Sequence, residues 1–272
     1  MKYLKDFNHI QLTEDTVLSL GKFDGLHRGH ELLMKSVFEK ARMGLKSAVF
    51  TFDVPPQSAA GHMQQVITTN AEKQRLFQEN GIDYLIECPF TKEIMHMQAE
   101  QFIEEIAKRL CVKWIVVGTD FRFGHNRRGD YRMLLQYAGL YGYQVQVVQK
   151  MQHRGRDISS TYIREEIEKG NIELANELLG YPYFIQGKIM HGNQIGRTIG
   201  FPTINIEPPL QKLLPPFGVY ASYVWLDGRR YGGITNIGKK PTIQGKHPVS
   251  AETYIYDFAE DVYDKEGRGD IL

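Results

Sequence analysis

The sequence predicts an α/β protein in two parts: a parallel sheet covered by helices, then a small antiparallel barrel or sandwich. Short apolar segments alternate with segments of helical periodicity as far as Gly180, which is typical of a parallel sheet with helices on both faces. Beyond Gly180 the helical periodicity fades, and glycine, proline, β-branched and aromatic residues dominate. There Asp227-Gly228 stands between Val224-Trp225-Leu226 and Arg230-Tyr231, which predicts an antiparallel hairpin.

The first part alternates its elements regularly. The expected strands are 16–20, 46–52, 83–87, 112–118 and 143–149. The expected helices lie near 30–43, 71–80, 98–110 and 130–141, and two more follow at 160–169 and 172–179. Asn70 can cap the second of these helices, and Gly81 can end it.

Tyr181 and Pro182 interrupt the helical pattern, so we expect a domain boundary near Tyr181. The boundary divides the chain into domains 1–181 and 182–272. The strands expected in the second domain are 184–190, 218–226, 230–236 and 250–257.

Composition narrows the class of protein. The 272 residues, 42% hydrophobic and 24% charged, are ordinary for a globular protein of two domains. A net charge of +1 argues against bulk attraction to nucleic acid or to an anionic membrane. No apolar run has membrane-spanning length, and the first residues lack the apolar core of a secretory signal. Cys88 and Cys111 exclude a disulfide framework, so we expect a cytoplasmic protein.

The segment Gly21–His30, GKFDGLHRGH, is the first candidate site. It follows an expected strand, and ligands of parallel sheets bind beyond the carboxyl ends of the strands. His27 and His30 would stand at the start of a helix, where free N–H groups favour a phosphate, and glycines allow close approach. Histidine donors there can stabilise the charge that develops during transfer of a phosphate group. A surface pair without a role, or half of a metal site, is the alternative.

Two further segments of the first domain carry polar groups suited to a nucleotide. Asp120 follows the expected strand 112–118 and would lie at the same edge of the sheet. Ser159, Ser160 and Thr161 lead a helix that carries Arg164, a combination that binds phosphate. An ordinary helix cap followed by a solvated arginine gives the same pattern.

In the second domain, Thr203 and Asn205 alternate with isoleucines, so a strand would point both polar groups to one face. That face could hold a metal ion or phosphate oxygens, or it could be the polar outer face of an edge strand. Glu252 has the parity of Tyr254 and Tyr256. A carboxylate there could act as a general base toward a hydroxyl, whereas the pattern alone favours a solvent-facing glutamate.

These segments together resemble a known family, the bacterial bifunctional riboflavin kinase/FMN adenylyltransferases, over nearly the whole chain. GKFDGLHRGH resembles the family's GxFDGxHxGH nucleotidyltransferase signature, and VVGTDFRFG and ISSTYIR resemble its next two motifs. GRTIGFPTINI resembles the kinase motif GFPTAN, with Ile204 in place of alanine. Further stretches similar to the kinase domain are LLPPFGVYA, ITNIGKKPTI and ETYIYDFAEDVYD.

The resemblance implies a Rossmann-like nucleotidyltransferase domain that transfers AMP from ATP to FMN, and a barrel domain that phosphorylates riboflavin with ATP. His27 and His30 would act in adenylyl transfer, Glu252 would activate the riboflavin hydroxyl, and Thr203 and Asn205 would hold Mg²⁺. ATP, FMN and riboflavin are the implied substrates. The other implied nucleotide- or phosphate-binding residues are Gly21, Phe23, Asp24, Gly25, Asp120, Ser159, Ser160, Thr161, Arg164, Gly196, Arg197, Gly200 and Pro202.

Two departures from the family pattern affect the expectation. The family has TFxPHP after its second strand, whereas the segment Thr51–Pro56 lacks the histidine. After Lys265 the family continues with another strand and a closing helix, whereas this chain ends in Glu266–Leu272. A barrel without its last strand has an open edge, so we expect a truncated, incomplete kinase domain with weakened activity or none. Alternatives are an FMN adenylyltransferase whose second domain only binds flavin, or a catalytically silent flavin or nucleotide sensor.

Overall fold

The structure is a computed structural model that describes residues 1–53, 65–190, 203–239, 249–258, 262 and 265–272. The chain forms two compact units. The first unit comprises Met1–His62 and Asn70–Ser159, and the second comprises Met63–Thr69 and Ser160–Leu272. Among the described helices, none combines the length and the apolar character needed to cross a membrane.

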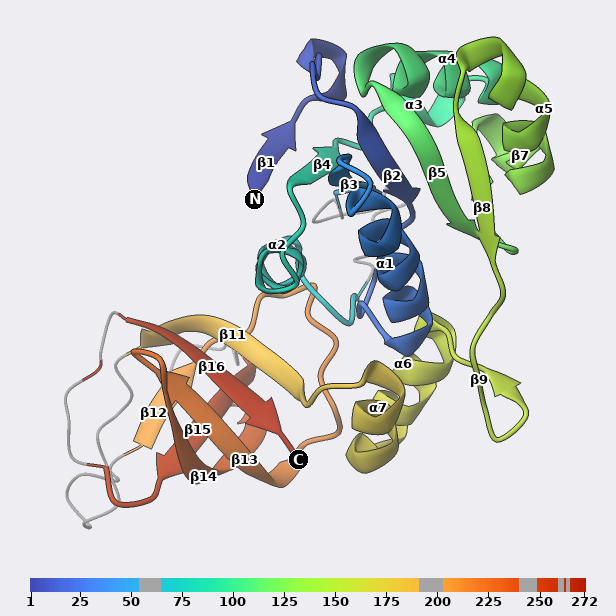
Figure 1. Ribbon diagram of the computed structural model, residues 1–272. Helices are drawn as coiled ribbons and strands as arrows, with labels where there is room; N and C mark the ends of the chain where they lie inside the picture. Colours follow the sequence, from blue (N-terminus) through green and yellow to red (C-terminus); the bar gives the residue numbers. More distant parts are fainter. Residues whose placement is uncertain (54–64, 191–202, 240–248, 259–261, 263–264) are drawn as a thin grey trace. The chain divides into compact units, whose positions relative to one another are not determined.

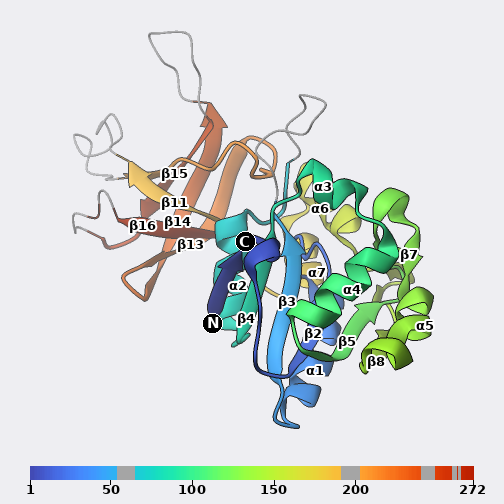
Figure 2. The same ribbon diagram turned by 90° about the horizontal axis from the view of Figure 1, so that it is seen from above.

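The first unit is built on a six-stranded sheet in which every pairing is parallel (Figures 1 and 2). The spatial order of the strands is β1-β4-β3-β2-β5-β8. Their bounds are Lys2–Lys5 (β1), Thr16–Leu20 (β2), Lys46–Phe52 (β3), Tyr84–Cys88 (β4), Val112–Gly118 (β5) and Gln144–Val148 (β8). All expected strands of this sheet are confirmed within one residue at each end, and β1 is an addition at the edge.

Five α-helices of the described residues belong to this unit. Their bounds are Arg28–Ala41 (α1), Asn70–Glu79 (α2), Lys92–His96 (α3), Ala99–Arg109 (α4) and Tyr131–Tyr141 (α5). Helix α1 packs against β2, β3 and β5, while Phe102 and Ile106 of α4 share an apolar cluster with Leu18 and Ile115 of the sheet. Smaller elements are η1 (Phe7–His9), β6 (Arg122–Phe123), η2 (His125–Arg127), β7 (Gly129–Asp130), β9 (Gln152–His153) and β10 (Arg156–Asp157).

The order of the strands reverses its direction beside β2, which is a topological switch point of the sheet. From β2 the chain proceeds to β3 and β4 on one side, and then returns to β5 and β8 on the other side. The loops that follow β2 and β5 therefore leave the sheet in opposite directions at its carboxyl edge, which is where open α/β sheets bind ligands. Gly21–His27 follows β2, and Thr119 and Asp120 follow β5.

In its described stretches, the second unit contains two helices and a closed six-stranded antiparallel barrel in the order β11-β12-β15-β14-β13-β16 (Figure 1). The bounds are Ser160–Lys169 (α6), Ile172–Leu179 (α7), Tyr183–Met190 (β11), Thr203–Ile206 (β12), Gly218–Leu226 (β13), Arg229–Lys239 (β14), Val249–Ile255 (β15) and Glu266–Ile271 (β16). The sequence predicts either a barrel or a sandwich for the second domain, and the structure has the barrel. The predicted hairpin is also confirmed, with Asp227 at φ +48° and Gly228 at φ +78° in the turn.

The expectation of an incomplete barrel with an open edge is wrong, because the last residues of the chain form β16. Strand β16 pairs with β11 from Tyr183↔Ile271 to Lys188↔Glu266, and with β13 from Ser222↔Ile271 to Trp225↔Arg268. The segment EGRGDI holds two glycines and one apolar residue, so neither strand propensity nor alternation marks it as a strand. Its glycines suit the barrel interior, since a Cβ on Gly267 would lie 3.0 Å from the side chain of Ile189.

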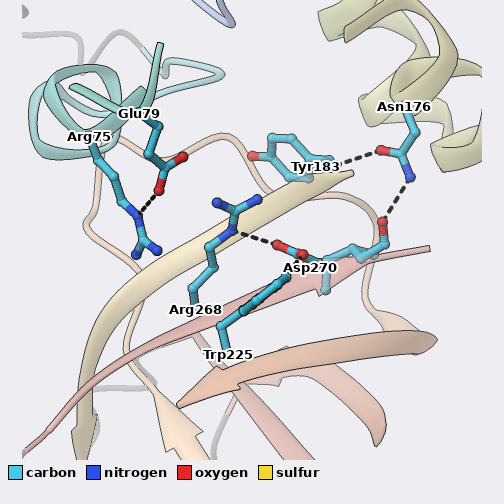
Figure 3. Close-up of polar contacts among 8 residues, drawn as sticks. Arg75, Glu79, Asn176, Tyr183, Trp225, Arg268 and Asp270 are labelled. Carbon is cyan, nitrogen blue, oxygen red and sulfur yellow. Dashed lines mark hydrogen bonds and ion pairs between the residues drawn. The ribbon is translucent and has the colours of Figure 1, made fainter. Parts of the chain in front are cut away.

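Side chains also tie β16 into the second unit (Figure 3). The carboxylate of Asp270 accepts a hydrogen bond from Arg268 Nε at 2.6 Å and another from Trp225 Nε1 at 2.7 Å. Asn176 of α7 accepts from the backbone N–H of Tyr183 at 2.6 Å and donates to the carbonyl of Ile271 at 2.9 Å. Helix α7 thereby links the first strand of the barrel to the last.

Candidate active sites

The histidine pair lies at the start of helix α1, as the sequence predicts. His27 is the residue that caps the helix, and the backbone N–H of His30 donates to its carbonyl at 2.7 Å. The two imidazole rings stack, with centroids 3.7 Å apart and planes 19° apart. His27 is 5% exposed, so the alternative of a surface pair is wrong.

Both imidazoles are neutral near pH 7. Burial lowers the pKa of His27 to about 4, against the opposing charges of Asp24 and Asp120. Burial, and then the neighbouring His27, hold the pKa of His30 well below its usual range. The Nδ1 atoms of both rings are buried and have no hydrogen-bond partner among the described residues. Because unsatisfied buried polar atoms cost free energy, these atoms indicate a place for a ligand with hydrogen-bonding oxygens.

The loop before the pair is held in an unusual backbone conformation. Phe23 has φ +50° and Gly25 has φ +88°, both in the left-handed region. The buried ring of Phe23 lies 5.1 Å from the ring of His30 and 5.4 Å, edge-on, from that of Phe77. A Cβ on Gly21 would lie 3.0 Å from the Phe23 ring. The positive φ of Phe23 therefore depends on packing around its side chain.

Gly29, between the two histidines, has a role that sequence reasoning missed. A Cβ on this residue would lie 3.1 Å from the imidazole of His27 and 3.5 Å from the carbonyl oxygen of Ile158. Ile158, the residue before Ser159, therefore lies against the first turn of α1. The HxGH spacing, in which glycine stands between the histidines, is the signal that could have identified it.

Asp120 lies at the same edge of the sheet as the pair, as expected. Asp120 follows strand β5, which is hydrogen-bonded to β2. The carboxylate of Asp120 is among the charges that act on His27. Asp120 is exposed, and its Oδ2 lies 3.1 Å from Nζ of Lys150.

The hydroxyl cluster leads a helix, as predicted: Ser160 is the first residue of α6, Ser159 precedes it, and Arg164 follows one turn later. Residues from Ser160 onward belong to the second compact unit. Phosphate binding by Ser159, Ser160, Thr161 and Arg164 stays a prediction.

The second site lies on strands β12 and β15 of the barrel. Asn205 stands opposite Glu252 in the register, and Thr203 Oγ1 donates to Glu252 Oε1 at 2.7 Å. The polar face expected for Thr203 and Asn205 is thus confirmed, while Ile204 belongs to the apolar core of the barrel. Glu252 is half-buried and hydrogen-bonded, so the pattern-based prediction of a solvent-facing glutamate is wrong.

The donor set of this second site fits a hard cation. Asn205 is 2% exposed, and its Oδ1 has no hydrogen-bond partner in the part of the chain that the structure describes. Amide, hydroxyl and carboxylate oxygens are the ligands that Mg²⁺ prefers. Asn236 of β14, which sequence reasoning missed, also stands opposite Glu252.

Several predicted positions lie outside the described residues. They are Gly196, Arg197, Gly200 and Pro202, together with the residues after Asp53 where the family's histidine is absent.

Comparison with known proteins finds matches along both parts of the chain. The FAD synthetase family model matches residues 9–162, and the riboflavin kinase model matches residues 179–272. The bifunctional riboflavin kinase/FMN adenylyltransferase of Escherichia coli K12 is 38% identical over 272 residues, which span 97% of this chain and 86% of that protein. The protein of the same name from Bacillus subtilis strain 168 is 36% identical over 255 residues, which span 91% of this chain and 80% of that protein.

A solved structure has the same fold. A crystal structure from Streptococcus pneumoniae, described as a macrolide-efflux protein, superposes with a TM-score of 0.87 and 31% sequence identity. The match covers 100% of this chain and 89% of that one. With two family models in the expected order and relatives of one name along almost its full extent, the chain belongs to the family of bifunctional riboflavin kinase/FMN adenylyltransferases.

Proposed function

We propose that the chain makes FAD from riboflavin in two steps, each at one of the two sites described above. The barrel site phosphorylates riboflavin with ATP to give FMN, and the site beside β2 transfers AMP from ATP to FMN, releasing pyrophosphate. The observation that carries the second assignment is the neutral pair His27 and His30, whose buried Nδ1 atoms have no partner among the described residues.

Adenylyl transfer depends mainly on the positioning of the two reactants and on stabilisation of the negative charge that develops on the phosphate oxygens. A phosphate oxygen of FMN attacks the α-phosphorus of ATP, and the bond from that phosphorus to the pyrophosphate oxygen breaks. Neutral imidazoles offer N–H donors to the phosphate oxygens, and the N-terminus of α1 adds its unpaired N–H groups. His27 and His30 thereby stabilise negative charge that develops during transfer. We assign supporting nucleotide contacts to Asp24, Gly25 and Asp120, and phosphate contacts to Ser159, Ser160, Thr161 and Arg164.

At the barrel site, Glu252 is the base. Its carboxylate accepts the proton of the riboflavin hydroxyl as that oxygen attacks the γ-phosphorus of ATP. The hydrogen bond from Thr203 orients the carboxylate. Thr203 and Asn205 are the residues that would hold Mg²⁺, which when bound offsets the charge of the ATP phosphates.

We also propose that the boundary between the two catalytic domains lies near Tyr181, and that ATP and flavins are the chain's small-molecule partners. The chain would act in the cytoplasm. The free thiols of Cys88 and Cys111 support a reducing compartment.

One assay tests the proposed function. The protein is incubated with Mg²⁺ and ATP and with either riboflavin or FMN, and the flavin products are separated and identified. FMN and FAD from riboflavin are expected. FAD from FMN alone would indicate an adenylyltransferase with a flavin-binding second domain, and tight flavin binding without product would indicate a sensor.

The variant His27→Ala tests which site performs which reaction. Loss of one donor that stabilises a transition state lowers turnover by roughly 100- to 1,000-fold, so FAD formation from FMN should nearly vanish. FMN formation from riboflavin should stay at the wild-type rate. Loss of both reactions would contradict the assignment of the histidine pair to adenylyl transfer.

A further inference from the structure

The first unit contains a buried cation that the two-step reaction does not use. Lys73 of α2 is 1% exposed, and its Nζ donates to the carbonyl of Phe52 at 3.0 Å and to Thr51 Oγ1 at 3.3 Å. The same Nζ lies 3.6 Å from Oε1 of Glu87, which is 2% exposed. Burial lowers the pKa of Lys73, while the charges of Glu87 and Asp24 oppose that shift.

A single hydroxyl links this cation to the loop before the histidine pair. Thr51 Oγ1 donates to the carbonyl of Lys22 at 3.1 Å. The hydroxyl proton is therefore directed to the loop, which leaves an oxygen lone pair for the ammonium of Lys73. The chain of contacts runs from Lys73 through Thr51 to Lys22, five residues before His27.

The same helix touches the loop a second time. Phe77 follows Lys73 by four residues and so shares its face of α2. The Phe77 ring packs edge-on against Phe23 at 5.4 Å, and Phe23 packs against His30 at 5.1 Å. Helix α2 thus supports the loop both at Lys22 and at Phe23.

A merely structural role does not account for this arrangement. Taking a lysine and a glutamate out of water carries a large desolvation cost, and a well-packed apolar pair stabilises a core equally well or better. The loop that the cation reaches is the one with a left-handed Phe23, a conformation that persists only where the surroundings hold it. Rate also depends steeply on the exact position of groups that meet a transition state.

We propose that Lys73, acting through Thr51, is a positioning residue for adenylyl transfer. It holds the loop Lys22–Leu26 so that His27 and His30 meet the reacting phosphate. The inference rests on the proposed function and deepens it, because it names what orients the histidine pair.

The test replaces the linking hydroxyl and leaves the ion pair in place. Thr51→Val keeps the side-chain shape but breaks the link, whereas Thr51→Ser keeps the hydroxyl and serves as the matched control. We expect Thr51→Val to lower kcat for FAD formation by about 10- to 100-fold, with little change in KM for FMN. Riboflavin phosphorylation by the same protein should be unchanged, and Thr51→Ser should behave as wild type.

A second variant removes the cation without leaving a lone buried charge. In Lys73→Met combined with Glu87→Gln, the pair becomes neutral at similar volume, and the same loss of kcat in FAD formation is expected. Equal kcat for Thr51→Val and Thr51→Ser would overturn the inference. So would a parallel loss of both activities with a lower unfolding temperature, since that indicates general destabilisation. Wild-type protein that forms no FAD would overturn the proposed function itself, and this inference with it.

Discussion

At the scale of single residues, the histidine pair owes its neutrality mainly to burial, and for His30 also to the neighbouring His27. Carboxylates near His27 favour its protonated form, yet desolvation outweighs them. The rings therefore meet ATP as uncharged donors, with Nδ1 atoms that have no hydrogen-bond partner in the part of the chain that the structure describes.

This neutrality predicts how stability depends on pH. A histidine in the unfolded chain titrates at about 6.5, whereas burial lowers the pKa of His27 in the folded protein to about 4. Between these values the unfolded chain binds more protons, so the free energy of unfolding should fall as pH falls from about 6.5 toward 4. Urea unfolding at neutral and mildly acidic pH measures the slope. The variant His27→Gln should show a shallower slope, and an unchanged slope would contradict the burial argument.

Substitution of Gly29 should change the activity without changing the stability of the fold. A Cβ at this position meets the His27 ring at 3.1 Å, so Gly29→Ala should displace the imidazole and lower kcat for FAD formation by about tenfold or more. Alanine is the better helix former, so thermal unfolding should change little. Gly139→Ala in α5 is the matched control because its Cβ would meet no atom within 4 Å. Equal activity of the two variants would rule out a role for Gly29 in placing His27.

At the scale of elements, the closing strand β16 depends on its partners more than on its own residues. It has hydrogen-bonded neighbours on both sides, β11 and β13, and its side chains are anchored by Asp270. Strand β16 therefore forms only when the rest of the barrel has assembled. The ion pair of Arg268 and Asp270 is the contact whose loss should destabilise it most.

Removal of that anchor should destabilise the barrel. The side chains of Arg268 and Asp270 are 12% and 6% exposed, so Asp270→Ala leaves a largely buried guanidinium and an unpaired indole N–H. The free energy of unfolding should fall by about 3 kcal/mol, as measured by denaturant titration. Glu104→Ala, which removes an exposed ion pair with Lys108, should cost less than about 1 kcal/mol. Similar losses in both variants would show that the Asp270 network adds nothing beyond an ordinary surface pair.

At the scale of the whole molecule, the two reactions follow one another because FMN is the product of one site and the substrate of the other. The two family models occupy separate stretches of the chain, 9–162 and 179–272. A single substitution in one site should therefore abolish one reaction and leave the other intact.

Mixing two inactive variants tests this separation. Neither His27→Ala nor Glu252→Gln should make FAD from riboflavin alone, the first because it stops at FMN and the second because it makes no FMN. An equal mixture should form FAD, since FMN released by the first variant reaches the intact adenylyltransferase site of the second. A mixture that stays inactive beside an active wild type would contradict the assignment of the two residues to different steps.

Much of the fold and of the sites could be predicted because the signals are local. The strands β2, β3 and β5 are short apolar runs, and alternation in 203–206 identified the polar face that carries Asn205. The histidine pair was recognisable from its spacing and its position after a strand. Strand β16 could not be predicted, because glycines and charges carry no strand signal until β11 and β13 pair with them.

The parallel sheet, the family and the two groups of residues proposed to bear the chemistry could be read from the chain alone, since periodicity and motif spacing are properties of neighbours in the sequence. The folded structure was needed to show that the barrel closes, that His27 is buried and both histidines are neutral, and that Lys73 reaches Lys22 through Thr51. The physical reason is that burial and pairing depend on groups far apart in the sequence, which meet only in the folded chain.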